Sequence, residues 1–156
     1  MDTREDPMDI FSHPYKKTKL KLGTLFYMKP RRNPDKPGRE LFVAYDDRFP
    51  IIEGFKTHYA YYVRFFEKGN QAGNHYHKKK QELFIPIIGS MAIELEDIAT
   101  KETEQLTMRH DEYCILHVGT EIAHKVTANE PGSVQLVMAT SPNNDGDEFP
   151  YKIPRA

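Results

Sequence analysis

Two histidines and a glutamate near the middle of the chain have the residue types and spacing best suited to chemistry. His75 and His77 stand two positions apart, and on a β-strand side chains at that spacing project from the same face. Two imidazoles from one strand form half of a transition-metal site, and Glu82 follows closely enough to add a carboxylate. His124 can bring a third imidazole from another strand. Such a set leaves a metal position open for water or substrate, which is typical of a catalytic site.

The pair of histidines carries little weight by itself, because short motifs recur by chance and histidines on a solvated strand often have no function. Three further histidines, His13, His58 and His110, have no partner at a ligand spacing, and we expect them at the surface. The metal site is therefore a hypothesis that needs support from the rest of the chain.

Short strands are the elements that must position these residues. Apolar runs rich in aromatic and β-branched residues alternate with turn residues, and Gly89-Ser90 is typical of a hairpin turn. No amphipathic helix of ordinary length is evident. The expected strands cover residues 16–22, 41–45, 59–66, 83–88, 91–96, 104–108, 113–118, 125–127 and 134–138. So many short strands in one chain predict an all-β sandwich or barrel.

Length and composition limit the classes of protein that remain. The 156 residues suit one domain, with a barrel at 16–141 between an N-terminal arm at 1–15 and a C-terminal tail at 142–156. The net charge of −1 gives no support to nucleic-acid binding. No apolar run is long enough to cross a membrane, and the polar, acidic start is unlike a signal peptide. The single cysteine, Cys114, excludes an internal disulfide, so we expect a cytoplasmic protein.

The spacing around the histidines resembles the first motif of the cupin superfamily. Gly69, His75-x-His77, Glu82 and Gly89 follow one another at the intervals of that motif. The segment from Gly119 to His124 resembles the second cupin motif, although its gap is longer, which leaves His117 as the alternative fourth ligand. The resemblance implies an all-β, single-domain cupin, a double-stranded β-helix or jelly-roll barrel. It also implies a divalent transition metal (zinc, iron, manganese or nickel) on four ligands: His75, His77, Glu82 and His124.

Within the cupins, the chain resembles the nucleotide-sugar 3,4-ketoisomerases of polysaccharide synthesis. Tyr61-Tyr62, Gly73, the run 75–79 (His-Tyr-His-Lys-Lys) and Gly89-Ser90 occur in the order of that group. The resemblance implies that His75 and His77 transfer protons next to a sugar keto group.

The chain departs from that group at two positions. The ketoisomerases work without metal and carry Arg and Gln where this chain has Ala72 and Glu82. An anionic Glu82 favours a bound cation. In this respect the chain resembles the zinc-holding cupin domain of capsular-sugar reductases, which shares the pattern of residues 73–77. The missing arginine removes a group expected to bind pyrophosphate or sugar.

These observations favour an isomerase or epimerase that acts on a sugar or nucleotide sugar by proton transfer next to a carbonyl. The expected catalytic residues are His75, His77 and Tyr62, with Tyr61 and Tyr76 as the other tyrosine candidates. Tyr76 is the weakest of these, because it alternates away from the histidines. Two alternatives remain open: a non-catalytic cupin that binds a carbohydrate or other small ligand, and a metal-dependent dioxygenase. By resemblance, we also expect a homodimer.

Overall fold

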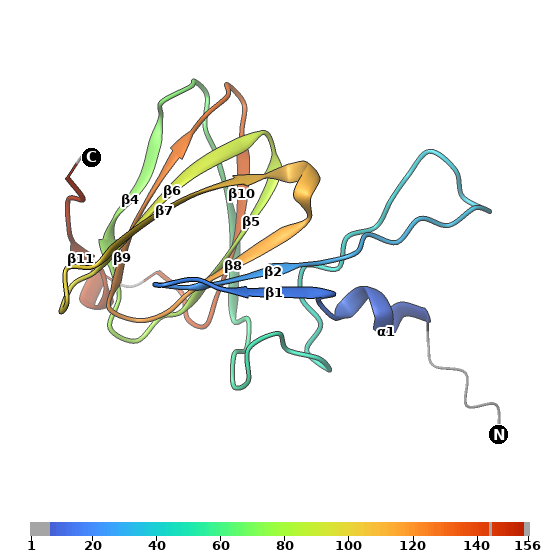
Figure 1. Ribbon diagram of the computed structural model, residues 1–156, viewed down its shortest axis with the longest axis horizontal. Coiled ribbons are helices and arrows are strands. Elements are labelled where there is room, and N and C mark those ends of the chain that lie inside the picture. Colours follow the sequence, from blue (N-terminus) through green and yellow to red (C-terminus); the bar gives the residue numbers. More distant parts are fainter. Residues whose placement is uncertain (1–6, 144, 155–156) are drawn as a thin grey trace.

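The chain folds as a barrel of two facing antiparallel β-sheets, which confirms the predicted all-β architecture (Figure 1). The computed structural model describes residues 7–143 and 145–154. Within these residues the first sheet has six strands in the order β1-β2-β8-β5-β10-β3. Its strands are β1 (Lys16–Lys19), β2 (Thr24–Tyr27), β8 (Cys114–Val118), β5 (Glu82–Ile88), β10 (Val134–Ala139) and β3 (Tyr59–Arg64).

The second sheet has five strands in the order β11-β4-β9-β6-β7 within the same described ranges. Its strands are β11 (Phe149–Pro150), β4 (Gln71–Tyr76), β9 (Ile122–Ala128), β6 (Ser90–Asp97) and β7 (Thr103–Arg109). The helical elements of the described chain are short: α1 (Pro7–Ser12) and the 3-10 helices η1 (His110–Glu112) and η2 (Asp145–Asp147). Neighbouring strands such as β4 and β9, or β5 and β10, are far apart in the chain, so the barrel brings distant segments together.

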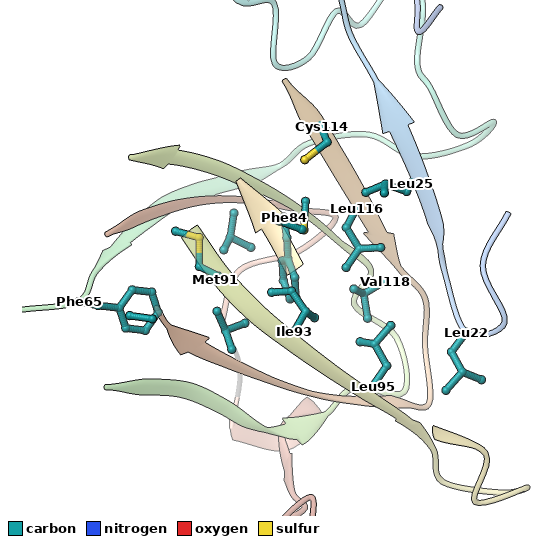
Figure 2. Packing of buried hydrophobic residues seen from close by; sticks show 14 residues of the cluster. Leu22, Leu25, Phe65, Phe84, Met91, Ile93, Leu95, Cys114, Leu116 and Val118 are labelled. Carbon is teal, nitrogen blue, oxygen red and sulfur yellow. The ribbon is translucent and has the colours of Figure 1, made fainter. Parts of the chain in front are cut away.

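The main hydrophobic core fills the space between the two sheets. Alternate residues of β6 point inward, and Met91, Ile93 and Leu95 are fully buried there. Figure 2 shows these side chains facing Phe84 of β5 and Leu116 of β8. The alternation of apolar and polar residues on these strands thus places one face of each strand in the core.

The six-stranded sheet is apolar on its outer face as well. Leu83, Ile85 and Ile115 are buried there in a second cluster, which the long connection between β2 and β3 covers. Part of that connection projects beyond the sheets in Figure 1. The expected strand at 41–45 is wrong, because this segment is irregular and packs its apolar side chains on the outer cluster. Burial, rather than strand pairing, explains its apolar composition.

Three strands are absent from the list of expected strands: β2, β4 and the two-residue β11 in the expected tail. β2 is only four residues long and follows directly on the run that suggested a single strand at 16–22. β4 contains Gly73 and Asn74, both at positive φ, and its register with β9 shifts between Gly73 and His75. Glycine and asparagine are rare in regular strands, so the apolar pattern did not indicate β4, although the spacing of His75 and His77 was interpreted as that of a strand.

The structure describes parts of both segments outside the predicted barrel. Of the expected N-terminal arm, residues 1–6 lie outside the described residues, and α1 precedes β1. Of the expected tail, residues 144, 155 and 156 also lie outside them, whereas β11 pairs with β4 and Asp147 of η2 contacts the residues that follow β4. Within the described chain, no helix has the length and apolar character to cross a membrane.

Replacing Ile93 by alanine tests the location of the core. Ile93 is fully buried between the sheets, so Ile93→Ala should lower the free energy of unfolding by about 2–5 kcal/mol through lost burial and an unfilled cavity. Chemical denaturation measures the loss, with the exposed Lys68→Ala as a control expected to stay within about 0.5 kcal/mol of the unaltered protein. A loss as small as that of the control would contradict this core.

Candidate functional site

Three imidazoles and one carboxylate converge inside the barrel. His75, His77, Glu82 and His124 each offer one ligand atom, and these atoms lie within 4.8 Å of one another. Three of the four side chains are buried, whereas that of His75 is 22% exposed. The structure therefore brings together the four residues that the two motifs pointed to, and His75 lies nearest to solvent.

The two sheets position these side chains from opposite walls. β4 and β9 pair so that His75 lies directly opposite His124, with 4.7 Å between the ring centroids. His77 follows β4, and its ring centroid is 4.9 Å from that of His75. Glu82 begins β5 in the facing sheet and is 2% exposed. The cluster thus depends on the barrel closing around it.

Gly73 allows β4 and β9 to approach closely beside the cluster. Its φ is +91°, a conformation that L side chains rarely adopt. A Cβ at this position would lie 2.5 Å from the backbone oxygen of His124. The absence of a side chain at residue 73 is therefore what lets the strand carrying His124 sit next to the strand carrying His75.

The outward nitrogen of each imidazole faces an oxygen atom. His77 Nδ1 lies 2.7 Å from the backbone oxygen of Asp147, and His75 Nδ1 lies 3.2 Å from Glu148 Oε1. His124 Nδ1 lies 3.4 Å from the backbone oxygen of Ile122. Carbonyl and carboxylate oxygens accept hydrogen bonds, so each Nδ1 is the donor. Each neutral ring then keeps its lone pair on Nε2.

The inner atoms of the cluster are acceptors placed against one another. Glu82 Oε1 lies 3.2 Å from His77 Nε2 and 3.4 Å from His124 Nε2. Among the described residues, neither His77 Nε2 nor Glu82 Oε1 has a hydrogen-bond partner, although both atoms are buried. Unpaired buried acceptors are costly, and a cation satisfies all of them together. The donor set of three imidazole nitrogens and one carboxylate fits a transition metal such as zinc, iron, manganese or nickel.

The pKa values of the cluster suit a cation as well. Burial and the nearby His124 lower the pKa of His75 to about 4, and burial lowers that of His124. Burial opposes ionisation of Glu82, but the neighbouring imidazoles and Lys80 outweigh it and lower its pKa to about 2. At neutral pH, His75 and His124 are therefore neutral and Glu82 is anionic, which are the forms that bind metals.

Tyr61, rather than Tyr62, is the tyrosine at the cluster. The Tyr61 hydroxyl donates a hydrogen bond to Glu82 Oε2 at 3.2 Å, and burial together with the Glu82 carboxylate raises its pKa. Tyr62 is the next residue of β3, so it points to the opposite face and is 70% exposed. Tyr76 stacks on Phe149 outside the cluster. Because side chains alternate along β3, Tyr61 faces the cluster and Tyr62 faces solvent. Among the described residues, Tyr62 has no contact with the cluster that would support its expected catalytic role.

His117 lies apart from the other histidines. It alternates with Leu116 and Val118, which face the core, and therefore points to the outer face of the six-stranded sheet. There it contacts Gln81 Oε1 at 2.8 Å and the ring of Phe55. The structure accordingly places His124, and not His117, beside Glu82.

Sequence reasoning missed the contribution of the C-terminal tail. Asp147 and Glu148 contact His77 and His75, although they follow them by about 70 residues in the chain. The polar tail contains a third acidic residue, Asp145, and no motif, so no local signal distinguished these two.

Comparison with known proteins identifies the family. Residues 31–150 match the model of the family described as FdtA: WxcM-like, C-terminal. The chain belongs to this family. No curated protein matches the chain at a significant level. The family agrees with the resemblance to sugar-modifying cupins that the histidine motifs indicated.

Solved structures of low sequence identity share the fold. QdtA, a sugar 3,4-ketoisomerase from Thermoanaerobacterium thermosaccharolyticum solved with TDP, has a TM-score of 0.65 at 23% identity, covering 84% of this chain and 89% of QdtA. WlaRA, a TDP-fucose-3,4-ketoisomerase from Campylobacter jejuni, has a TM-score of 0.68 at 16% identity, with 81% and 87% covered. The dTDP-4-dehydrorhamnose 3,5-epimerase of Bacillus anthracis has a TM-score of 0.72 at 12% identity, with 85% and 81% covered. The predicted cupin jelly roll is confirmed.

A methyl group at residue 73 should disturb the cluster through the backbone of β9. Gly73→Ala forces a Cβ against the His124 carbonyl, whereas Gly54→Ala, also at positive φ, has no described atom within 4 Å of its Cβ. Both changes strain the backbone, so their difference isolates the steric contact. We expect Gly73→Ala to lose about 1–3 kcal/mol more stability, the usual range for overpacking, in denaturant unfolding. Equal losses in the two variants would contradict the close approach.

Proposed function

We propose that the protein is an isomerase or epimerase that acts on a nucleotide-linked sugar by proton transfer next to a carbonyl. Membership of the FdtA: WxcM-like family and the shared fold of QdtA, WlaRA and the dehydrorhamnose epimerase support this substrate class. The cluster inside the barrel supplies groups that accept and donate protons, from strands of both sheets.

We further propose that His75, His77, Glu82 and His124 hold a divalent transition metal. The observation that carries this proposal is the convergence of buried acceptors: Glu82 Oε1 faces two Nε2 atoms, and among the described residues no donor satisfies it. A bound metal of this kind polarises a carbonyl oxygen as a Lewis acid, which makes the adjacent carbon–hydrogen bond more acidic.

The protein's own groups have distinct parts in this scheme. As ligands, the histidines contribute their Nε2 lone pairs, and Glu82 contributes the negative charge. Tyr61 keeps its proton because its pKa is raised, so its hydroxyl serves as a donor to Glu82 or to a substrate oxygen. His75 is the partly exposed member of the cluster, and a substrate entering the barrel meets it first.

Metal content tests the ligand set directly. Glu82→Gln preserves shape but removes the anionic ligand, so its affinity for zinc or cobalt should fall by more than the roughly 10–100-fold that follows loss of an outer partner. His117→Ala is the matched control, because His117 lies on the other face of the sheet and should leave affinity unchanged. Titration with a colorimetric competitor measures both. Equal affinity of Glu82→Gln and the unaltered protein would rule out this site.

Proton exchange tests the reaction class. TDP-4-keto-6-deoxyglucose, the ligand of one QdtA structure, is the first substrate to test. Incubation with it in D2O should place deuterium on a carbon beside the carbonyl, and NMR follows both the exchange and any isomer formed. Tyr61→Phe should slow exchange by about 10²–10⁴-fold, the usual contribution of a positioned acid or base, whereas Tyr62→Phe should not.

Removing the metal separates the two proposals. Chelation should abolish the exchange, and added metal should restore it. Full activity without metal would contradict the metal proposal and leave the isomerase intact, whereas no exchange under any condition, with a panel of nucleotide sugars, would contradict the isomerase.

A further inference from the structure

We propose that the C-terminal residues 143 and 145–150, here called the strap, place the ring proton of His75 and of His77 on Nδ1, which leaves Nε2 of each ring as the nitrogen that can bind a metal. The strap acts through the backbone carbonyl of Asp147 and the carboxylate of Glu148, which are therefore positioning groups. The inference rests on the metal site of the proposed function, because it explains how the donor atoms of that site are oriented.

The strap is fixed to the histidine loop at several points. The Asp147 carboxylate accepts hydrogen bonds from three successive backbone N–H groups, those of Lys78, Lys79 and Lys80, at 2.9–3.1 Å. The buried Lys80 ammonium donates to Asn143 Oδ1 at 2.7 Å. Because these bonds join the strap to the residues that directly follow His77, the two segments are held in one arrangement.

The end of the strap is fixed to β4 itself. Phe149 and Pro150 form β11, which pairs with Tyr76 and His75 of β4. The Phe149 ring stacks on that of Tyr76, with 5.1 Å between the centroids. Glu148 directly precedes this pairing, so its position relative to His75 is set by the backbone of both strands.

At His77, the backbone carbonyl of Asp147 is compatible with only one of the two neutral tautomers of the ring. A backbone carbonyl has no proton to give, so the 2.7 Å contact between Asp147 O and Nδ1 requires a proton on Nδ1. The imidazole is 4% exposed, and its other nitrogen, Nε2, lies 3.2 Å from Glu82 Oε1. Without the strap carbonyl, a proton on Nε2 would bond to Glu82, and the ring would no longer offer a lone pair there.

At His75, the Glu148 carboxylate accepts the hydrogen bond from Nδ1, as the Asp147 carbonyl does at His77. Glu148 Oε1 lies 3.2 Å from Nδ1, and an ionised carboxylate only accepts hydrogen bonds. His124 shows the same orientation, but its Nδ1 faces the carbonyl of Ile122 on its own strand. Two of the three imidazoles of the cluster therefore depend on a segment some 70 residues away for the atom that they direct inward. Carboxylate or carbonyl partners of this kind orient metal-binding histidines and raise their affinity for the ion.

Nitrogen-15 NMR of the metal-free, full-length protein reads the tautomers without any assay of activity. Long-range correlations from the ring carbons' protons should show Nδ1 protonated and Nε2 unprotonated for both His75 and His77 at pH 8. In Glu148→Ala, His75 should gain the Nε2-protonated form, whereas His77 should keep its tautomer. Glu148→Gln should retain the Nδ1-protonated form of His75, because the amide oxygen still accepts a hydrogen bond.

Metal affinity supplies the second measurement. Glu148→Ala should weaken binding of zinc or cobalt by about 10–100-fold, the usual effect of removing such a partner, and Glu148→Gln should restore most of it. Lys152→Ala, which alters an exposed residue further along the C-terminal segment, is the matched control and should bind metal normally. Thermal unfolding of each variant shows whether the barrel remains intact.

The outcomes separate this inference from the proposed function. Nε2-protonated His75 or His77 in the unaltered protein would overturn the inference, even if a metal binds. An unchanged His75 tautomer in Glu148→Ala would overturn the part assigned to Glu148. The expected tautomers in a protein that binds no metal would support the inference while contradicting the metal proposal.

Discussion

Burial of the Glu82 carboxylate is the constraint on which the rest of the site depends. Glu82 is 2% exposed, and one of its oxygens faces the Nε2 atoms of His77 and His124 while the other accepts a hydrogen bond from Tyr61. A buried anion is strongly unfavourable unless it is paired with positive charge. A metal ion at the centre of the cluster would supply that charge, which is why we propose one there.

The polar centre shares the interior of the barrel with the main hydrophobic core, and the ring centroids of His124 and the core residue Phe84 are 5.2 Å apart. One core fills the space between the sheets around Ile93 and Leu95, and a second covers the outer face of the six-stranded sheet around Ile85. The strands that carry Glu82 and His124 are therefore anchored by apolar packing along their length. Rigid strands of this kind hold ligands more precisely than loops do. The strap adds the outer partners that orient two of the imidazoles.

Much of the fold followed from sequence patterns, and the exceptions have physical causes. The alternation in 91–96 predicted β6, because its inward residues form the core. The apolar run 41–45 is not a strand, since burial against a neighbouring sheet favours the same residues as strand pairing does. Tyr61 and Tyr62 are adjacent and chemically identical, so only the register of β3 with β10 decides that Tyr61 faces the cluster and Tyr62 faces outward.

By itself, the sequence determined which ligand types are available: the His-x-His spacing, a following glutamate and a later histidine, within a chain of short strands. Those features depend on local geometry, because side chains two apart on a strand share a face. The tertiary structure alone decided that His124 rather than His117 joins Glu82, and which nitrogen of each imidazole faces inward. These choices depend on contacts between residues far apart in the chain, such as His77 and Asp147, and such contacts exist only once the barrel has closed.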